Sequence, residues 1–587
     1  MVCGMTREDA VQILERIALL LELKGENPFK VRAYRTGAEV VQGYGDDIMR
    51  LAAEGALAGI KGIGDALRDK LKEMATTGRL EFYEKLKAEF PEGLFELFQV
   101  QGLGPKKIAA LYSTLGVGSI DDLKRACASG EAAKLSGFGA KTVEKILESI
   151  AFREQHATEF AAEQVYAVAQ SILEALREHP KVTRAEVCGS FRRGKETVHD
   201  LDFLVATKEP EAVIGDFVKL PVVSQVIAQG GTKASVHTAT GLQCDLRAVS
   251  RKEFPFALTY FTGSKEHNVV LRQRALDKGW SLNEYAFTPV EGKEGPPIPP
   301  VHDEADLYRA LGLDYVDPEL RENMGEFEAA VHGRLPHLVH LENLRGVFHN
   351  HTTASDGAAT LREMADAAQE LGLQYLGISD HSKSSFQANG LNEARLRAQI
   401  EEIRELNQEY DKGVFRVFAG TEVDILKDGT LDFEDALLAE LDFVVASVHN
   451  LFNLPEAEMT KRIIRAIENP HVTMLGHLTG RLLLTRPGYA VDVPAIIEAA
   501  AATGTIIELN ANPWRLDMDW RWWRLAKEKG VKCSINPDAH SARELQGVLF
   551  GVRSARKGWL TRRDVVNCLP LGEIEQMLRK KREQHGI

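Results

Sequence analysis

From about residue 346 to the end of the chain, short apolar runs alternate with helical segments. The runs include LQYLGISDH, VFRVFAGTEVDI, DFVVASVH, VTMLGH, GTIIELNA and VKCSINPDAH. Strands separated by helices are joined in parallel, and an alternation that continues for ~230 residues closes into a barrel. The sequence therefore predicts an α/β barrel of parallel strands in this part of the chain.

Residue types that bind metals stand at the ends of these apolar runs. His349 and His351 are two positions apart in FHNHTTASDG, so on an extended strand both imidazoles point to one face. This pair alone is a weak signal, because such spacing also occurs by chance. Later runs end in SDHS, GTEVD, SVHN, GHLTG and PDAHS, and barrel enzymes collect their catalytic groups at the strand ends. The repeated pattern predicts a metal site there.

The same pattern resembles the PHP (polymerase and histidinol phosphatase) domain over residues ~346–570. The resemblance implies a distorted (β/α)7 barrel that holds about three Mn²⁺ or Zn²⁺ ions and hydrolyses phosphate esters. It implies that Glu422 bridges metals and that Asn510, Arg515 and Asp517 belong to the site, with Arg515 near phosphate. The metal ligands that it implies are His349, His351, Asp356, His381, Glu422, His449, His477, Asp538 and His540.

The first ~155 residues show a different pattern, in which helices are separated by short glycine turns. The turns are IKGIGDALRDKL (60–71), VQGLGPKKIAALY (100–112) and LSGFGAKTVEKIL (135–147). Two glycines permit a tight hairpin with positive φ, and the following helix begins with free backbone N–H groups. Those groups and the helix dipole can hold one phosphate.

These turns could bind the DNA backbone through local groups. An acidic chain that binds DNA needs such local contacts, because its overall charge does not attract DNA. The chain has a net charge of −13, which argues against a protein that coats nucleic acid by bulk attraction. One such turn could simply join two helices. Three copies with lysines behind the glycines favour contacts with the DNA backbone, and they resemble helix-hairpin-helix motifs. The candidate DNA-binding residues here are Gly62, Gly64, Gly102, Gly104 and Lys106.

Between these regions, the segment VCGSFRRGKETVHDLDFLV (187–205) predicts a second metal site. Asp200 and Asp202 are alternate residues of a strand, so their carboxylates share one face. Hard oxygen ligands suit Mg²⁺, which completes its shell with substrate phosphate and water. The turn at Gly189 can hold phosphates, and LQCDLRAV supplies Asp245 on a neighbouring strand. This set is typical of two-metal nucleotidyl transfer, whereas the strand aspartates alone could form a solvated edge.

The segments CGSFRRG…DLDFLV, YFTGSKEHN (260–268) and LNEYAF (282–287) resemble the family X DNA polymerases, the polymerase beta group, over roughly residues 1–318. The resemblance implies an α+β palm and thumb that use DNA and dNTPs, with two Mg²⁺ or Mn²⁺ ions on the three catalytic aspartates. Gln243 stands beside the third aspartate, where animal members have an arginine, which predicts altered surroundings for the nucleophile. The contacts implied are Gly189, Ser190 and Arg193 with the triphosphate, Tyr260, Phe261 and Gly263 with the sugar, Asn268 with the base and Arg272 near the template.

The N-terminal region also resembles the lyase domain of that family. NPFKVRAYRTGAEVV and GIGDALRDKLKEM match it, and Lys70 stands where the Schiff-base lysine would be. Two further basic positions of the family are Ala66 and Phe82 here, so Lys70 could equally be an exposed helix lysine. The residues that match the phosphate side of this domain are Lys30, Tyr34 and Arg35.

The length of 587 residues is too great for one core and predicts several domains. The six cysteines form no CxxC pair, the N-terminus has no apolar signal core, and no run of ~20 apolar residues predicts a membrane span. A monomeric cytoplasmic protein is the expectation. The predicted divisions are a lyase-like domain (1–90), a helix-hairpin-helix domain (91–155), a palm (156–255), a thumb-type domain (256–318), a linker (319–345) and a PHP domain (346–587).

Together the two resemblances predict a bacterial polymerase that fills short gaps in DNA repair, including base excision repair, on gapped or primer-template DNA. Its PHP domain would act as a metal-dependent 3′–5′ exonuclease or DNA-end phosphoesterase. Three alternatives remain: a PHP domain that is structural or only positions DNA, a scaffold that binds DNA ends, and a template-independent nucleotidyltransferase.

Overall fold

The computed structural model describes residues 7–43, 47–60, 62–91, 93–97, 100, 103–156, 158–410 and 413–584. They fall into two compact units, Met1–Ala157 with Gly357–Thr360 and Thr158–Asp356 with Leu361–Ile587. Within the described residues, no helix is both long and apolar enough to span a membrane.

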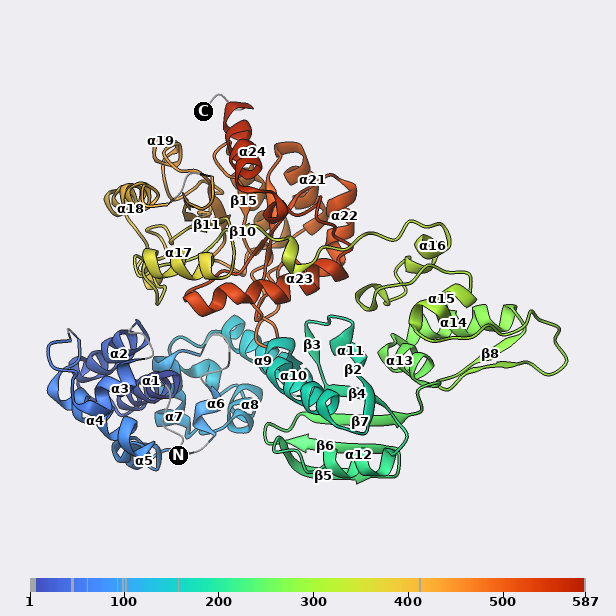
Figure 1. Cartoon of the computed structure of the whole chain (residues 1–587). Helices are drawn as coiled ribbons and strands as arrows, with labels where there is room; N and C mark the ends of the chain where they lie inside the picture. Colours follow the sequence, from blue (N-terminus) through green and yellow to red (C-terminus); the bar gives the residue numbers. More distant parts are fainter. Residues whose placement is uncertain are drawn as a thin grey trace. The chain divides into compact units, whose positions relative to one another are not determined.

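The N-terminal part of the first unit is helical throughout its described residues, which confirms the all-α expectation (Figure 1). It contains two hydrophobic cores, one around Leu14 and Leu71 and one around Ile108 and Ile146. The helices are α1 (Arg7–Leu23), α2 (Pro28–Gly43), α3 (Asp47–Glu54), α4 (Asp65–Thr77), α5 (Glu81–Lys87), α6 (Leu94–Leu97), α7 (Pro105–Leu115), α8 (Ile120–Ala128), the short η1 (Ala132–Lys134) and α9 (Ala140–Gln155).

The second unit begins with a five-stranded sheet in the predicted palm. The strand order is β2-β4-β7-β6-β5, in which β4 and β7 run parallel and the other neighbours run antiparallel. The elements are β1 (Phe160–Ala161), α10 (Ala162–Glu178), β2 (Val182–Val187), α11 (Gly189–Arg192), β3 (Thr197–Val198), β4 (Asp200–Thr207), α12 (Pro210–Phe217), β5 (Val223–Gln229), β6 (Lys233–Thr238) and β7 (Gln243–Val249).

The two faces of this sheet are buried by different helices. Phe203 of β4 packs in a core with residues of α10 and α12, and Leu204 packs in a separate core with residues of α13 (Phe254–Thr262). Because side chains alternate along a strand, Asp200 and Asp202 share the face of Leu204. The alternation therefore directs both carboxylates to the side of the sheet that α13 covers.

The next segment contains α13, α14 (Lys265–Asp277), β8 (Trp280–Leu282), β9 (Phe287–Pro289), α15 (Glu304–Ala310), η2 (Pro318–Leu320) and α16 (Glu326–Val331). Its core includes Trp280 and Leu307 together with Leu320, Ala330 and Leu338. Part of the segment predicted as a linker thus packs into this core.

A buried carboxylate fastens this segment to the palm. Glu304 accepts hydrogen bonds from Arg192 Nη2 and Arg321 Nη1, each at 2.6 Å, and only 6% of its surface is exposed. Burial alone would raise the pKa of Glu304, but the two guanidinium groups lower it below its ordinary value. The buried Arg321 and the half-buried Arg192 thus keep this carboxylate ionised at the junction.

The C-terminal part of the second unit forms a barrel of parallel strands, which confirms the predicted architecture (Figure 1). Two ladders have the orders β10-β11-β12 and β13-β14-β15-β16-β17, and a parallel bridge between Asn350 and Ala539 joins their outer ends. The strands are β10 (Gly346–Val347), β11 (Tyr375–Ile378), β12 (Arg416–Ala419), β13 (Glu422–Asp424), β14 (Val445–Ser447), β15 (Met474–Leu475), β16 (Ile506–Asn510) and β17 (Cys533–Asn536).

Glycines in two of these strand positions make room for the aromatic core. A Cβ on Gly377 would lie 2.5 Å from a ring carbon of Phe348, and one on Gly420 would lie 2.4 Å from Phe443. Gly420 and Thr421 separate β12 from β13, which belong to different ladders. The break between the two ladders therefore lies where the Phe443 ring packs against Gly420.

The barrel strands are surrounded by the helices drawn in yellow to red in Figure 1. These helices are α17 (Leu361–Glu370), α18 (Glu393–Leu406), α19 (Asp435–Leu438), α20 (Glu456–Ile467), α21 (Val493–Thr503), α22 (Trp523–Glu528), α23 (Val548–Lys557) and α24 (Leu571–Gln584). The connecting 3-10 turns are η3 (Leu341–Asn343), η4 (Phe386–Ala388), η5 (Trp520–Trp522), η6 (Ala542–Gly547) and η7 (Val566–Cys568).

Candidate metal centres and nucleotide site

Three carboxylates meet on the palm sheet. β4 carries Asp200 and Asp202, and the parallel register pairs Asp202 directly with Asp245 of β7. Gln243 donates from Nε2 to the two carboxylate oxygens of Asp245 at 3.2 and 3.4 Å. Lys233 lies 3.9 Å from the same carboxylate. Gln243 thus contacts the third aspartate directly.

The electrostatics of this group favour a divalent cation. Burial and the neighbouring Asp200 and Asp245 carboxylates raise the pKa of Asp202 to about 7. Burial and Asp245 also raise the pKa of Asp200. Carboxylates that resist ionisation because they crowd one another are stabilised by a bound cation, and oxygen donors are the ligands that Mg²⁺ prefers.

The turn before the first aspartate favours glycine at position 189. Gly189 has φ +63°, and a Cβ there would lie 2.4 Å from Oδ2 of Asp202. This close approach places the backbone of the Gly189–Arg192 turn, including Ser190, directly beside the carboxylate. The turn is therefore positioned to present backbone groups to a phosphate that a metal at Asp202 also contacts.

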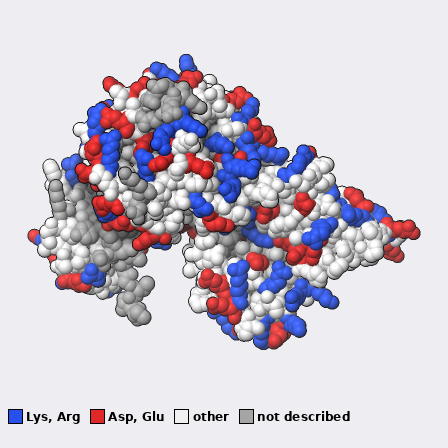
Figure 2. All heavy atoms as spheres, turned by 45° about the horizontal axis from the view of Figure 1, so that its top comes forward, with Lys and Arg blue, Asp and Glu red and all other residues white. Residues whose placement is uncertain are grey.

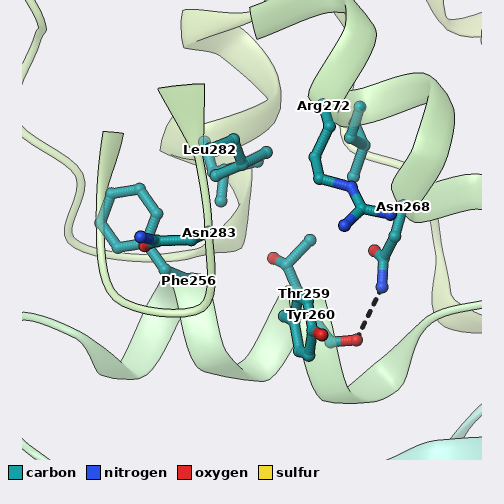
Figure 3. Close-up of a pocket in the computed structure, with 9 residues that line it drawn as sticks. Phe256, Thr259, Tyr260, Asn268, Arg272, Leu282 and Asn283 are labelled. Carbon is teal, nitrogen blue, oxygen red and sulfur yellow. Dashed lines mark hydrogen bonds between the residues drawn. The ribbon is translucent and has the colours of Figure 1, made fainter. Parts of the chain in front are cut away.

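Residues predicted to select the nucleotide form a pocket next to α13. Tyr260, Asn268 and Arg272 all line it, together with Phe256 and the β8 turn (Figure 3). Asn268 donates from Nδ2 to the backbone carbonyl of Tyr260 at 2.7 Å, as the dashed line shows. The hydrogen bond fixes the asparagine amide at the pocket wall, where its remaining groups could meet a base.

The other predicted nucleotide contacts lie at the end of α13. The Phe261 ring lies 4.6 Å from the guanidinium carbon of Arg247. Arg193 donates from Nη1 to the carbonyl of Thr262 at 2.6 Å. Gly263 has φ +67°, and a Cβ there would lie 3.3 Å from the same Arg193 nitrogen. Arg193 is thereby held between the palm turn and the nucleotide-selecting segment.

The barrel gathers all nine residues of its predicted ligand set. Among the described residues, four overlapping groups have potential ligand atoms within 4.8 Å of one another. The groups are His351, Asp356, His381 and His540; His349, Glu422 and His477; His349, His351 and Asp538; and His381, Glu422 and His449. Overlap means that neighbouring groups share a residue, as a multinuclear centre requires.

Glu422 occupies the middle of this cluster. Its Oε1 lies 2.8 Å from Nε2 of His477 and 3.1 Å from Nε2 of His449, and its Oε2 lies 2.9 Å from Nδ1 of His381. Burial alone would raise the pKa of Glu422, but the surrounding histidines lower it well below its ordinary value. An ionised carboxylate with both oxygens facing imidazoles has the arrangement of a bridging ligand.

The residues present fit a set of bound metals. Both ring nitrogens of His351, Nε2 of His349 and Oε2 of Glu422 are buried without a hydrogen-bond partner among the described residues. Burial and the neighbouring His540 and His381 imidazoles lower the pKa of His351 to about 4, so this ring is neutral at pH 7. Neutral imidazole and carboxylate are the forms that bind Mn²⁺ or Zn²⁺.

A second layer of carboxylates orients the ligands, and the sequence interpretation missed it. Glu508 accepts from Nδ1 of His349 at 2.6 Å and from the backbone N–H of His477 at 2.8 Å. Asp424 lies 3.0 Å from Nδ1 of His449. Such partners fix the tautomer and orientation of a metal-binding histidine. An acidic residue inside an apolar strand run, as in IIELN, was the signal that could have revealed Glu508.

The remaining residues implied by the PHP resemblance also lie at this cluster. Arg515 approaches Asp538, with its Nε 3.4 Å from Oδ2, and Asn510 donates to the same oxygen at 3.0 Å. Asp517 is fully buried and accepts from the backbone N–H of Thr479 at 2.9 Å. Asp517 therefore faces the protein interior.

In the first unit, the glycine turns lead directly into helices. Gly64 and Gly104 are the N-caps of α4 and α7, and Gly62 has φ +94°. Gly102 lies outside the described residues, and so does the side chain of Lys106. The described turns thus leave helix N-termini available for a phosphate, as the pattern predicts.

The candidate lyase lysine lies against the two positions where basic residues are missing. Lys70 donates from Nζ to the carbonyl of Ala66 at 3.3 Å, and its ammonium lies 5.0 Å from the Phe82 ring centre. Tyr34 stacks on Phe82, with ring centres 6.1 Å apart. On the phosphate side, Arg35 pairs with Glu22, and Lys30 lies 3.5 Å from Glu26.

Charged side chains of both signs are interspersed over the face drawn in Figure 2. With a net charge of −13, attraction to DNA over the whole molecule is weak. The predicted contacts with DNA would therefore depend on particular groups, such as helix N-termini and the cations at the nucleotide pocket.

Family models match most of the chain. They are a helix-hairpin-helix domain (residues 5–80), a SAM-like helix-hairpin-helix tandem (95–151), the DNA polymerase beta palm (161–241), the DNA polymerase beta thumb (257–322) and a PHP domain (348–512). The palm match contains Asp200 and Asp202, and the PHP match contains most of the barrel ligands.

A relative covers the whole architecture. The DNA polymerase/3′-5′ exonuclease PolX of Bacillus subtilis is 40% identical over 578 residues, which are 98% of this chain and 100% of that protein. Other relatives match the barrel region only. A probable phosphatase of Thermoanaerobacter sp. is 30% identical over 250 residues, and one of Clostridium acetobutylicum is 30% identical over 206 residues. They span 40% and 33% of this chain, and 96% and 77% of their own lengths.

Proposed function

Because the chain belongs to the family X DNA polymerases that carry a C-terminal PHP domain, we propose that it fills short gaps in DNA and trims 3′ ends on one polypeptide. The observation that carries this proposal is the presence of two complete acidic or histidine-rich clusters, one on the palm sheet and one in the barrel. Neither cluster has lost a predicted member.

In the palm, Asp200, Asp202 and Asp245 would hold two Mg²⁺ or Mn²⁺ ions, which supply activation of the primer 3′-hydroxyl and neutralisation of the triphosphate. The Gly189 turn lies beside Asp202 and gives backbone donors to the phosphates. Arg193 adds a cation on the same side.

The pocket in Figure 3 gives nucleotide selection a structural basis. Tyr260 and Phe261 at the end of α13 would exclude the 2′-hydroxyl of a ribonucleotide by occupying its space. Asn268 would meet the base edge, and Arg272 would lie near the template strand.

In the barrel, the nine predicted ligands would hold about three Mn²⁺ or Zn²⁺ ions, which supply an activated water and a Lewis acid for phosphodiester hydrolysis. Glu508 and Asp424 keep the histidines in their binding orientation. Arg515 would face a scissile phosphate from beside Asp538. The domain would remove a 3′ nucleotide or blocking group before the palm extends that end.

One gel tests both activities. A 5′-labelled gapped duplex is incubated with the full chain and Mn²⁺, with and without dNTPs. Shortening without dNTPs and one-nucleotide filling with them is the expected result. Filling without shortening would leave a polymerase whose PHP domain is structural or positions DNA. Extension without template would replace the gap-filling assignment by a terminal transferase.

A further inference from the structure

Palm, thumb and barrel meet on one carboxylate of the second unit. Glu322 accepts hydrogen bonds from Lys557 Nζ at 2.5 Å and from Arg193 Nε at 3.1 Å, both on Oε1. Lys195 lies 3.5 Å from the other oxygen. Lys557 ends α23 of the barrel, Arg193 belongs to the palm, and Glu322 is the last residue of the thumb match. Three domains therefore share this ion cluster.

The cluster is almost closed to water. The side chain of Lys557 is 0% exposed, that of Glu322 12% and that of Arg193 13%. The Lys557 ammonium also donates to the carbonyl oxygens of Arg193, at 3.1 Å, and Glu319, at 3.4 Å. A buried charge is tolerated only with such a complete set of partners, and removing one partner leaves the other charge uncompensated.

The barrel holds the palm turn at further points. Arg553 donates to the carbonyl of Phe191, and Arg481 pairs with Glu196. Gly194, with φ +70°, packs against Glu319 and the backbone of Arg553. The segment that follows the Gly189 turn is thus held in place by side chains of the PHP domain.

Arg193 has two partners in this arrangement, and one of them is Glu322. Its Nη1 donates to the Thr262 carbonyl, and its Nε donates to the carboxylate. The carboxylate offsets the positive charge that the guanidinium can offer to a triphosphate, and this offset is smaller when another cation shares the carboxylate. Lys557 is already bound to the same oxygen, at the shorter distance.

We propose that Lys557 of the PHP domain is a positioning residue for polymerisation: by neutralising Glu322 it leaves the Arg193 guanidinium able to bind the triphosphate of the incoming nucleotide. This inference rests on the proposed function of the palm site. It makes the barrel part of the nucleotide-binding apparatus, independently of its own metal chemistry.

Without Lys557, only Arg193 and Lys195 of this ion cluster would remain to neutralise the Glu322 carboxylate. Arg193 would then be held on the carboxylate, and the free enzyme would bind dNTP more weakly. In the K557M variant of the full chain, we expect KM for dNTP on gapped DNA to rise about tenfold, with kcat changed less than about twofold. A K557R variant, which keeps the charge, should recover part of the loss.

The double variant K557M/E322Q separates positioning from packing. Removing the carboxylate charge frees Arg193 again, so KM should return to within about threefold of the wild-type value. K529M serves as the matched control, because Lys529 pairs with Glu498 and both side chains are exposed. Mn²⁺-dependent nuclease activity and the thermal unfolding midpoint show whether each variant keeps its fold.

Each outcome decides the question. A wild-type KM in K557M overturns the inference, and so does an equal rise of KM in K557M and the double variant. If K557M does not fold, the double variant decides, because it removes both the Lys557 and the Glu322 charge: a KM within about threefold of the wild-type value is expected, and a larger rise contradicts the inference. Absence of gap filling by the wild-type chain, or a normal KM in R193A, would instead remove the proposed role of the palm site.

Discussion

The palm site and the barrel site both collect acidic side chains, but they balance that charge differently. In the barrel, each carboxylate faces imidazoles, and overlapping sets of ligand atoms lie within 4.8 Å of one another. In the palm, the three aspartates face one another, and burial with this crowding raises the pKa of Asp202 to about 7. The only direct polar support to Asp245 among the described residues is Gln243, with Lys233 at 3.9 Å.

This difference predicts that the barrel holds its metal ions permanently, whereas the palm completes the coordination of its metal ions only when the substrate binds. Mixed nitrogen and oxygen ligands with a second layer of carboxylates form a preorganised site for divalent metal ions. A few carboxylates on paired strands leave most positions around Mg²⁺ to water and phosphate. The barrel should therefore retain its metals between turnovers, and the palm should gain its own with the nucleotide.

The largest expected effect is on the palm. Replacing Asp200 and Asp202 by asparagine in one variant removes two anionic ligands while the turn at Gly189 keeps its shape. Primer extension should fall on the order of 10³-fold or more, as happens when preorganised charge is removed from an active site. Nuclease activity in Mn²⁺ should stay at the wild-type level, because the barrel ligands are untouched. Continued extension would remove the polymerase assignment from this site.

The reciprocal variant tests the barrel. Replacing His349 and His351 by alanine removes two fully buried ligands that belong to three of the four ligand groups. Degradation of a 5′-labelled single strand in Mn²⁺ should disappear, while gap filling in Mg²⁺ stays within about twofold because the palm aspartates are intact. Unchanged degradation would place the nuclease elsewhere, and a parallel loss of gap filling would show that the two sites are not independent.

Much of this comparison could be predicted from local sequence. The spacing of Asp200 and Asp202 follows from strand alternation, and the histidines at strand ends follow from the barrel pattern. The partners that tune these sites could not be predicted, because they join segments far apart in the chain. Glu508 contacts His349 across 159 positions, and Lys557 contacts Glu322 across 235. No periodicity links such pairs; only the packing of whole domains brings them together.

Glu508 offers a smaller, sharper test of the idea of a resident cluster. The E508Q variant keeps the shape of the side chain but removes the charge that holds His349 and orients the loop at His477. Mn²⁺ affinity should fall 10- to 100-fold, roughly the range for partners behind metal ligands. Titration calorimetry on the metal-free chain measures this, with E498Q on the exposed face of α21 as the charge-matched control. Equal affinities in the two variants would contradict a supporting role.

The smallest expected effect concerns the one neutral partner of the palm site. Gln243 donates a single Nε2 group to both oxygens of Asp245, at 3.2 and 3.4 Å, and such a long, shared interaction with a partly solvated carboxylate contributes only about 1 kcal/mol in all. The Q243L variant should therefore lose about fivefold in kcat/KM for gap filling, whereas Q225L on the exposed edge strand β5 should lose nothing. A loss as large as that of the aspartate variant would mean that Gln243 holds the third ligand in place. Activity of the palm would then depend on supporting residues as strongly as activity of the barrel does. The two sites would differ only in the types of metal ligand that they use.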